Sequence, residues 1–392
     1  MLKLSRDVRP FPFVLEGEWA LAGADPFLLL VAKDERVSVW REGRERSFRA
    51  NPFDVLQELL GELAGSPGHA VGAFGYELGA HLERLPRRAV DDLRFPDLIL
   101  GFYAPGRSGA VGPADYEDAF GGAEEAPAGA TFTRERYLDA VRRAKEYIYA
   151  GDVYQVNLSQ RFHARIEEDP WDAWERLRAR HPAPFSAFLR FGRRALLSVS
   201  PERFLELRGG RLVTCPIKGT RRRSPGAAEE LLASPKDDAE LAMIVDLERN
   251  DLGRVCEAGT VRVTAPKTLE THPTVYHLSA TIEGRCAKGP VDVLRATFPG
   301  GSITGAPKIR AMEIIDELEP ARRGFYTGAI GAIGFDGTMD LSIAIRTAQV
   351  DGANYYVQAG GGVVADSDPA AEYEETLAKA AGLAGALGMR IP

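Results

Sequence analysis

The N-terminal part of the chain combines short apolar stretches with one helical pattern. Residues 27–31 (FLLLV) and 36–40 (RVSVW) are typical of two short strands joined by a polar turn. Residues 53–63 place apolar side chains at helical spacing. This part of the chain is therefore predicted to be mixed α and β.

Helical patterns continue in the C-terminal two thirds of the chain. Thr133 can cap a helix that runs to Gly151. Another helix is predicted after Pro307, because proline is favoured at the first turn. Its apolar stripe consists of Ile309, Met312, Ile315 and Leu318.

Three strand patterns follow that helix. They cover residues 325–335, 339–350 and 354–358, and Asp-Gly pairs separate them. Such a pair between apolar stretches is the strongest short hairpin signal, so an antiparallel meander is expected. Long hairpin strands with helices before and after them favour the α+β class over a doubly wound sheet.

A change in composition predicts a division of the chain near residue 130. Most residues between 104 and 130 are Gly, Ala or Pro, and no apolar period survives there. We expect an N-terminal support region at residues 1–130, which includes this segment, and a second region at 131–392.

Composition and charge narrow the classes of function. The 392 residues are 45% hydrophobic, as in ordinary globular proteins, and carry a net charge of −7. The acidic balance disfavours a nucleic-acid partner. The N-terminus lacks the apolar core of a signal peptide, and no stretch is long enough to cross a membrane, so we expect a cytoplasmic protein.

Two predicted helices carry acidic side chains on one face. Glu372, Glu375 and Lys379 share a face of the last helix. Asp237 and Glu240 lie one turn apart in a helix that Ser234 can cap. By spacing alone, solvated faces with ion pairs explain both patterns. If the two faces met, one carboxylate from each could hold a magnesium ion and attract an anionic substrate.

Three further features could carry chemistry, although each has an ordinary structural explanation. The run Gly360, Gly361 and Gly362 lets backbone amides approach an anion, or forms a bulge. Lys218 ends a strand pattern beside several arginines, where a lysine can lose its proton and become a nucleophile, unless it is simply exposed. Glu202 is a general acid if it faces a closed pocket, and a surface residue otherwise.

Taken together, these segments resemble the chorismate-utilising enzymes. The likeness covers residues 131–387. It rests on GDVYQVNLSQRF, SPERF, PIKGT, MIVDLERNDLGR, TFPGGSITGAPKIRAMEIIDELEP, IAIRTA and AGGGVVADSDPAAEYEET. The resemblance implies an anthranilate synthase-like fold, in which two antiparallel sheets pack as a sandwich with helices outside. It makes residues 131–392 the chorismate-binding catalytic region.

The resemblance also implies roles for individual residues. Glu240 and Glu375 match ligands of the magnesium ion, with Asp237 and Glu372 one turn away. Glu202 matches the general acid, and the remaining positions match the substrate pocket. These pocket residues are Gln155, His277, Ser302, Thr304, Tyr326, Arg346, Gly360, Gly361, Gly362 and Lys379.

Lys218 indicates the branch of the family. In the aminodeoxychorismate branch, the lysine of PIKGT is the proposed nucleophile at C2 of chorismate, and ammonia then enters at C4. The anthranilate branch usually has alanine there, so PIKGT favours 4-amino-4-deoxychorismate, the precursor of 4-aminobenzoate and folate. Anthranilate synthesis, for tryptophan, and a non-catalytic module that binds chorismate or tryptophan are the alternatives.

The chain shows no nucleophile for glutamine hydrolysis. It contains no GxSxG elbow, and none of its cysteines lies in a GxCxG turn. We therefore expect a separate glutaminase subunit to supply ammonia.

Overall fold

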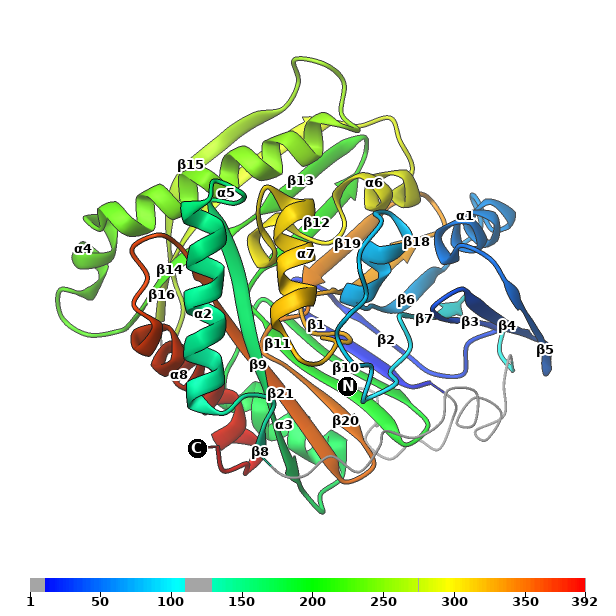
Figure 1. Ribbon diagram of the computed structural model, residues 1–392. Helices are drawn as coiled ribbons and strands as arrows, with labels where there is room; N and C mark the ends of the chain where they lie inside the picture. Colours follow the sequence, from blue (N-terminus) through cyan, green and yellow to red (C-terminus); the bar gives the residue numbers. More distant parts are fainter. Residues whose placement is uncertain (1–10, 110–128, 274, 392) are drawn as a thin grey trace.

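The computed structural model describes residues 11–109, 129–273 and 275–391. Most of the Gly/Ala/Pro-rich segment at 104–130 lies outside these ranges. Within them, the chain forms two large antiparallel sheets with helices on their outer faces (Figure 1). The predicted α+β class and two-sheet architecture are confirmed.

One sheet has nine strands. Its order is β17-β9-β21-β20-β11-β10-β1-β2, and β8 pairs with β9. The strands are β1 (Phe13–Gly17), β2 (Leu21–Gly23), β8 (Gly129–Ala130), β9 (Gln155–Arg165), β10 (Phe185–Phe191), β11 (Arg194–Ser200), β17 (Gly305–Ala306), β20 (Thr347–Asp351) and β21 (Asn354–Val363).

The other sheet has twelve strands, in the order β14-β16-β13-β12-β19-β18-β6-β7-β3-β4-β5, with β15 paired to β16. They are β3 (Leu28–Lys33), β4 (Arg36–Arg41), β5 (Arg44–Arg49), β6 (His69–Phe74), β7 (Leu98–Tyr103), β12 (Arg203–Arg208), β13 (Arg211–Cys215), β14 (Ile217–Arg222), β15 (Arg262–Thr271), β16 (Val275–Arg285), β18 (Ala329–Gly334) and β19 (Met339–Ile343).

Helices flank both sheets. They are α1 (Pro52–Glu62), α2 (Arg134–Tyr149), α3 (Pro170–Arg180), α4 (Ala227–Leu232), α5 (Pro235–Gly253), α6 (Pro290–Thr297), α7 (Lys308–Leu318) and α8 (Pro369–Leu387), with short 3-10 helices η1 (Tyr76–His81) and η2 (Gly301–Ile303). No helix of the described residues is long and apolar enough to cross a bilayer.

The alternation of side chains along β10 explains the layers. Phe185 and Leu189 pack between the sheets, in a core that they share with Leu29 of β3 and Ile330 of β18. Phe188 points the other way, into a core beneath α3 and α8. Because both faces of each sheet bury apolar side chains, the layers order as helices, sheet, sheet, helices.

The N-terminal strands belong to these same two sheets. β1 pairs with β10, and β6 pairs with β18, so residues before 130 complete both sheets. The division near residue 130 stays a prediction.

The predicted meander differs from the structure in its middle strand. Residues 339–350 form two strands, β19 and β20, which lie in different sheets. The break falls at Arg346, whose φ of 47° lies in the left-handed region. Apolar patterning marks both halves as strands and cannot show that the chain changes sheets between them.

Candidate active site

The candidate site lies where the chain passes from one sheet to the other. Glu202 sits between β11 of the nine-stranded sheet and β12 of the twelve-stranded sheet. Arg346 sits at the return crossing, between β19 and β20. Because β11 pairs with β20 and β12 with β19, the two crossings are neighbours (Figure 1). The fold therefore brings side chains from distant segments to one seam.

Glu202 is buried, and its raised pKa allows the carboxyl group to carry a proton at neutral pH. Its side chain is 4% exposed, and its Oε1 accepts a 2.5 Å hydrogen bond from Ser302 Oγ. Burial raises the pKa of Glu202 to about 7, although Ser302 and Lys218 act to lower it. A carboxylic acid with such a pKa suits general acid catalysis at neutral pH.

Lys218 lies beside the same serine. Its Nζ donates to the Ser302 backbone carbonyl at 3.0 Å. Burial lowers the pKa of Lys218, while the carboxylates Glu202 and Glu240 act to raise it. The amine is thus held near an acid in a place where burial favours its neutral, nucleophilic form.

His277 and Arg346 form a polar pair next to these groups. Arg346 Nη2 donates to His277 Nε2 at 3.4 Å, and His277 Nδ1 lies 2.8 Å from Thr220 Oγ1. Since arginine only donates, Nε2 accepts and Nδ1 carries the proton. Burial, with Arg346 beside it, lowers the pKa of His277 to about 3, so the ring stays neutral. Arg346 remains the cation available to a substrate carboxylate.

One carboxylate from each of the two acidic helices lies within reach of the charge of the other. Glu240 of α5 and Glu375 of α8 are close enough for their charges to interact. Burial raises the pKa of Glu240. Partial desolvation acts to raise the pKa of Glu375, but Lys379, 2.7 Å from its Oε1, acts together with Lys236 and Lys218 to lower it.

The neighbouring carboxylates are held by hydrogen bonds. Asp237 accepts from Arg221 at 3.0 Å, and Glu372 accepts from Ser367 Oγ at 2.6 Å. A side chain on Gly361 would place Cβ only 3.0 Å from Glu372 Oε2 and 3.5 Å from Glu375 Oε1. Glycine at this position therefore lets both glutamates approach the strand.

This donor set fits a magnesium ion. Carboxylate oxygens are hard ligands, and Mg²⁺ usually takes one or two of them together with waters and substrate oxygens. In the described part of the chain, no group of three or more His, Cys, Asp or Glu side chains could hold a metal by itself. A magnesium site that uses Glu240 and Glu375 therefore stays a prediction.

The glycine run is part of a regular strand. Gly360, Gly361 and Gly362 lie within β21 and pair with residues 157–159 of β9. The Gly360 carbonyl accepts from Lys379 Nζ at 3.0 Å. Gln155 is buried below Gly362, and its Nε2 has no partner among the described residues.

The remaining pocket candidates are buried near Ser302. Tyr326 is 5% exposed and lies in the turn before β18. Thr304 is fully buried, and its hydroxyl donates to the Gly300 carbonyl at 3.0 Å, which steadies the turn around Ser302. The roles of these residues toward a substrate stay predictions.

Sequence reasoning missed three side chains around the site. Thr220 holds His277, and only its place in PIKGT could have suggested this. Arg323 is 1% exposed and donates to the Ile303 carbonyl at 3.2 Å, beside Ser302. Glu248 is buried and accepts from Thr214 Oγ1 at 2.7 Å, and burial raises its pKa to about 8.

Comparison with known proteins shows the family of this chain. A sequence model described as chorismate binding enzyme matches residues 16–385. The chain belongs to the family of chorismate binding enzymes. The expected family is therefore confirmed.

Curated relatives come from two branches of that family. Aminodeoxychorismate synthase component 1 of Klebsiella aerogenes is 42% identical over 95% of this chain and 92% of that protein. Anthranilate synthase component 1 of Thermus thermophilus is also 42% identical, over 82% of this chain and 78% of that protein. Of these two matches, the one to the aminodeoxychorismate synthase covers more of this chain.

A solved structure supports the fold. Anthranilate synthase component I from Streptococcus pneumoniae superposes with a TM-score of 0.79 at 29% identity, covering 95% of this chain and 92% of that one. The structural likeness to an anthranilate synthase therefore extends over nearly the whole chain.

Proposed function

We propose that this enzyme converts chorismate and ammonia to 4-amino-4-deoxychorismate. The observation that carries the proposal is the contact of Lys218 and Glu202 with the same residue, Ser302. A non-catalytic binding module needs neither a nucleophile nor a proton donor, so this pairing favours chemistry. The curated aminodeoxychorismate synthase relatives support the choice of reaction.

The first half of the reaction removes the C4 hydroxyl. The neutral Lys218 amine attacks C2 of the ring, both ring double bonds shift toward C4, and the C4–O bond breaks. Hydroxide is a poor leaving group, so Glu202 donates its proton and the oxygen leaves as water. Lys218 is then bound to C2, and Glu202 is a carboxylate.

The second half installs nitrogen and restores both residues. Ammonia attacks C4, both ring double bonds shift back, and the bond from C2 to Lys218 breaks with its electron pair returning to the lysine nitrogen. The new amine releases a proton to Glu202. Lys218 and Glu202 thus recover their starting states, and the net change is ammonia for water.

The anionic substrate needs several cationic contacts. Arg346 is the half-buried arginine at the sheet crossing, and its planar guanidinium can donate two hydrogen bonds to one carboxylate. We assign Glu240 and Glu375 as ligands of a magnesium ion, which would neutralise the ring carboxylate when bound. In the structure, Lys379 forms an ion pair with Glu375, and Lys236 forms one with Glu240.

We propose that a second protein supplies the ammonia. The relatives carry the name component 1, which fits a partner subunit, and we propose a glutaminase. The product would serve 4-aminobenzoate and folate synthesis. A cytoplasmic location belongs to the same proposal.

Anthranilate synthesis is the second candidate, because anthranilate synthase relatives reach the same identity. Product analysis separates the two. The purified chain is incubated with chorismate, magnesium and an ammonium salt, and the product is identified by mass and by coupling to an aminodeoxychorismate lyase. Release of 4-aminobenzoate supports the proposal, whereas fluorescent anthranilate without the lyase, or no turnover, contradicts it.

A further inference from the structure

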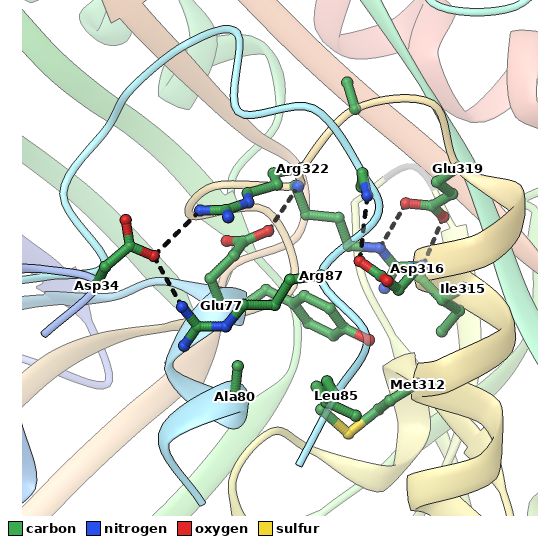
Figure 2. Close-up of a pocket in the computed structure, with 14 residues that line it drawn as sticks. Asp34, Glu77, Ala80, Leu85, Arg87, Met312, Ile315, Asp316, Glu319 and Arg322 are labelled. Carbon is green, nitrogen blue, oxygen red and sulfur yellow. Dashed lines mark hydrogen bonds and ion pairs between the residues drawn. The ribbon is translucent and has the colours of Figure 1, made fainter. Parts of the chain in front are cut away.

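Arg323 is a buried arginine to which the proposed reaction gives no role. It lies between α7 and β18, in the wall of a small pocket beside η1 (Figure 2). Its side chain is 1% exposed. Glu77 accepts from its backbone N–H at 2.9 Å, so the main chain is fixed as well (Figure 2). A charged side chain is rarely buried to this extent unless it is fully paired.

The guanidinium of Arg323 donates five hydrogen bonds, as many as it has N–H groups. Nε and Nη2 donate to the two carboxylate oxygens of Glu319 at 2.9 and 2.7 Å (Figure 2). Nη2 also donates to the Asn157 carbonyl at 2.6 Å. Nη1 donates to the Ile303 carbonyl at 3.2 Å and to Thr327 Oγ1 at 3.0 Å. Arg323 therefore has no donor left to offer a substrate.

Two of these bonds hold the turn that carries Ser302. Ile303 follows Ser302 in η2, and its carbonyl is one acceptor of Arg323. Asn157 is another acceptor, and its backbone N–H donates to the Thr304 carbonyl at 2.9 Å. The turn is thus held by Arg323 directly and, through Asn157, by β9.

A third bond holds the turn before β18. Thr327 has a φ of 62°, in the left-handed region, which is unfavourable for a β-branched residue. The bond from Arg323 to its hydroxyl helps to fix this conformation. Tyr326, a candidate for the substrate pocket, belongs to the same turn, and its ring centroid lies 5.9 Å from the guanidinium carbon of Arg323.

The ion pair with Glu319 accounts for only two of the five N–H groups. The other three join β9, η2 and the turn before β18. Two of these segments carry residues assigned above to the reaction or to the substrate, namely Ser302 and Tyr326. Such an arrangement suits a residue that sets the geometry of the active site.

We propose that Arg323 is a positioning residue of the active site. It fixes Ser302, and through Ser302 the relative position of Lys218 and Glu202. This role depends on the functions proposed for Lys218 and Glu202, and not on which aminated product the enzyme forms.

Replacement of Arg323 by lysine tests this role. Arg323→Lys keeps a positive charge beside Glu319, but an ammonium has three N–H donors and cannot form all five bonds. The Ser302 turn then loosens, and because a displacement of about 1 Å can cost about 100-fold in rate, we expect kcat to fall by about 10- to 100-fold. The rate is followed as loss of chorismate at saturating magnesium and ammonium salt, below the melting temperature of every variant.

The alkaline limit of kcat shows whether Arg323 acts through Ser302. The Ser302 hydroxyl acts to lower the pKa of Glu202, so a looser turn should raise that pKa and move the alkaline limb up. When Arg323→Lys is combined with Ser302→Ala, the limb should move no further than in Ser302→Ala, because the hydroxyl is already absent. The charged groups that act on Glu202 are the same in all these variants. They are Lys218, Glu248, Glu270 and Arg346.

Arg322→Lys is the matched control. Arg322 is the neighbouring arginine, and its side chain pairs with Asp34 and Asp91 at 3.4 Å rather than with η2. Its kcat and its alkaline limb should match those of the wild type.

Thr327→Val serves where Arg323→Lys does not fold, because it removes one of the five bonds and keeps the shape of the side chain. Its kcat should fall about fivefold, as for the loss of one hydrogen bond. Thr327→Ser keeps the hydroxyl and should retain the wild-type rate. Equal rates in Thr327→Val and Thr327→Ser would contradict the proposal.

A wild-type kcat in Arg323→Lys, with only a lower melting temperature, overturns the proposal, because Arg323 then serves stability alone. A lower kcat with an alkaline limb that stays in place also overturns it, because Ser302 is then not the route. Formation of anthranilate by the wild type contradicts the proposed function instead, and the comparison of chorismate loss still decides the role of Arg323.

Discussion

The roles proposed for Lys218 and Glu202 depend on the burial of these two side chains. In water a lysine is charged and a glutamate ionised at pH 7, so neither could attack or donate. The buried seam between the sheets lowers the pKa of one and raises that of the other. Ser302 contacts both, with its backbone oxygen on Lys218 and its hydroxyl on Glu202, and so fixes their relative position.

The Ser302 hydroxyl should influence the pH above which activity falls, through the pKa of Glu202. Its hydrogen bond favours the ionised form of Glu202, so Ser302→Ala raises the pKa of that acid above about 7. Because the protonated acid then persists to higher pH, we expect the alkaline limb of kcat to move up by about one unit. The pH profile of kcat measures this.

Ser200→Ala is the control for that experiment. The Ser200 hydroxyl accepts from the backbone N–H of Glu202 and does not touch its carboxyl group. Its profile should match the wild type. A limb that stays in place or moves down in Ser302→Ala would mean that Glu202 is not the acid reported by the profile.

At the scale of elements, local signals predicted boundaries well. Thr133 and Ser234 cap α2 and α5 through side-chain oxygens that accept from backbone N–H groups. Gly337 and Gly352 have positive φ in the expected hairpin turns. The apolar stripe of α7 was less accurate, because Ile309 is 44% exposed at the start of the helix, where no other element covers it fully.

The proposed magnesium site predicts that Glu240 of α5 and Glu375 of α8 share a dependence on the metal. Glu240→Gln and Glu375→Gln each remove one carboxylate from the pair, so both variants should lose activity at magnesium concentrations that saturate the wild type. The rate is measured over a magnesium titration. Glu374→Gln is the control, because Glu374 is an exposed neighbour on α8.

Two outcomes would contradict the assignment of Glu240 and Glu375 as magnesium ligands. Wild-type activity that survives complete chelation of divalent ions would remove the metal from the reaction. Equal magnesium curves for Glu375→Gln and Glu374→Gln would show that Glu375 is not a ligand.

At the scale of the whole molecule, the site is built from distant segments. Glu202 and Ser302 are 100 positions apart in the chain and meet because the strands change sheets. The likeness to a known family placed these residues together, whereas periodicity and spacing alone could not. Patterns also could not reveal Thr220, Glu248 or Arg323, because one polar residue within a strand or helix does not show which distant element it faces.

A buried ion pair links several of these segments. The side chains of Arg323 and Glu319 are 1% and 3% exposed, and Arg323 also donates to the Asn157 carbonyl at 2.6 Å. Arg323→Met leaves the Glu319 charge buried without its partner, which costs about 3–5 kcal/mol and lowers the melting temperature. Arg323→Met with Glu319→Leu should be less destabilised than the single variant, and a more destabilised double variant would contradict this.

The central claim is that Lys218 bonds covalently to the chorismate ring, and mass spectrometry of the protein tests it most directly. The enzyme is incubated with chorismate and magnesium without ammonia, quenched, and mapped by peptide. The peptide that contains Lys218 is expected to gain the mass of chorismate less one water. The corresponding peptide of Lys218→Ala should show no added mass. This variant should also lose formation of 4-amino-4-deoxychorismate. An unmodified Lys218, together with undiminished turnover in Lys218→Ala, would contradict it.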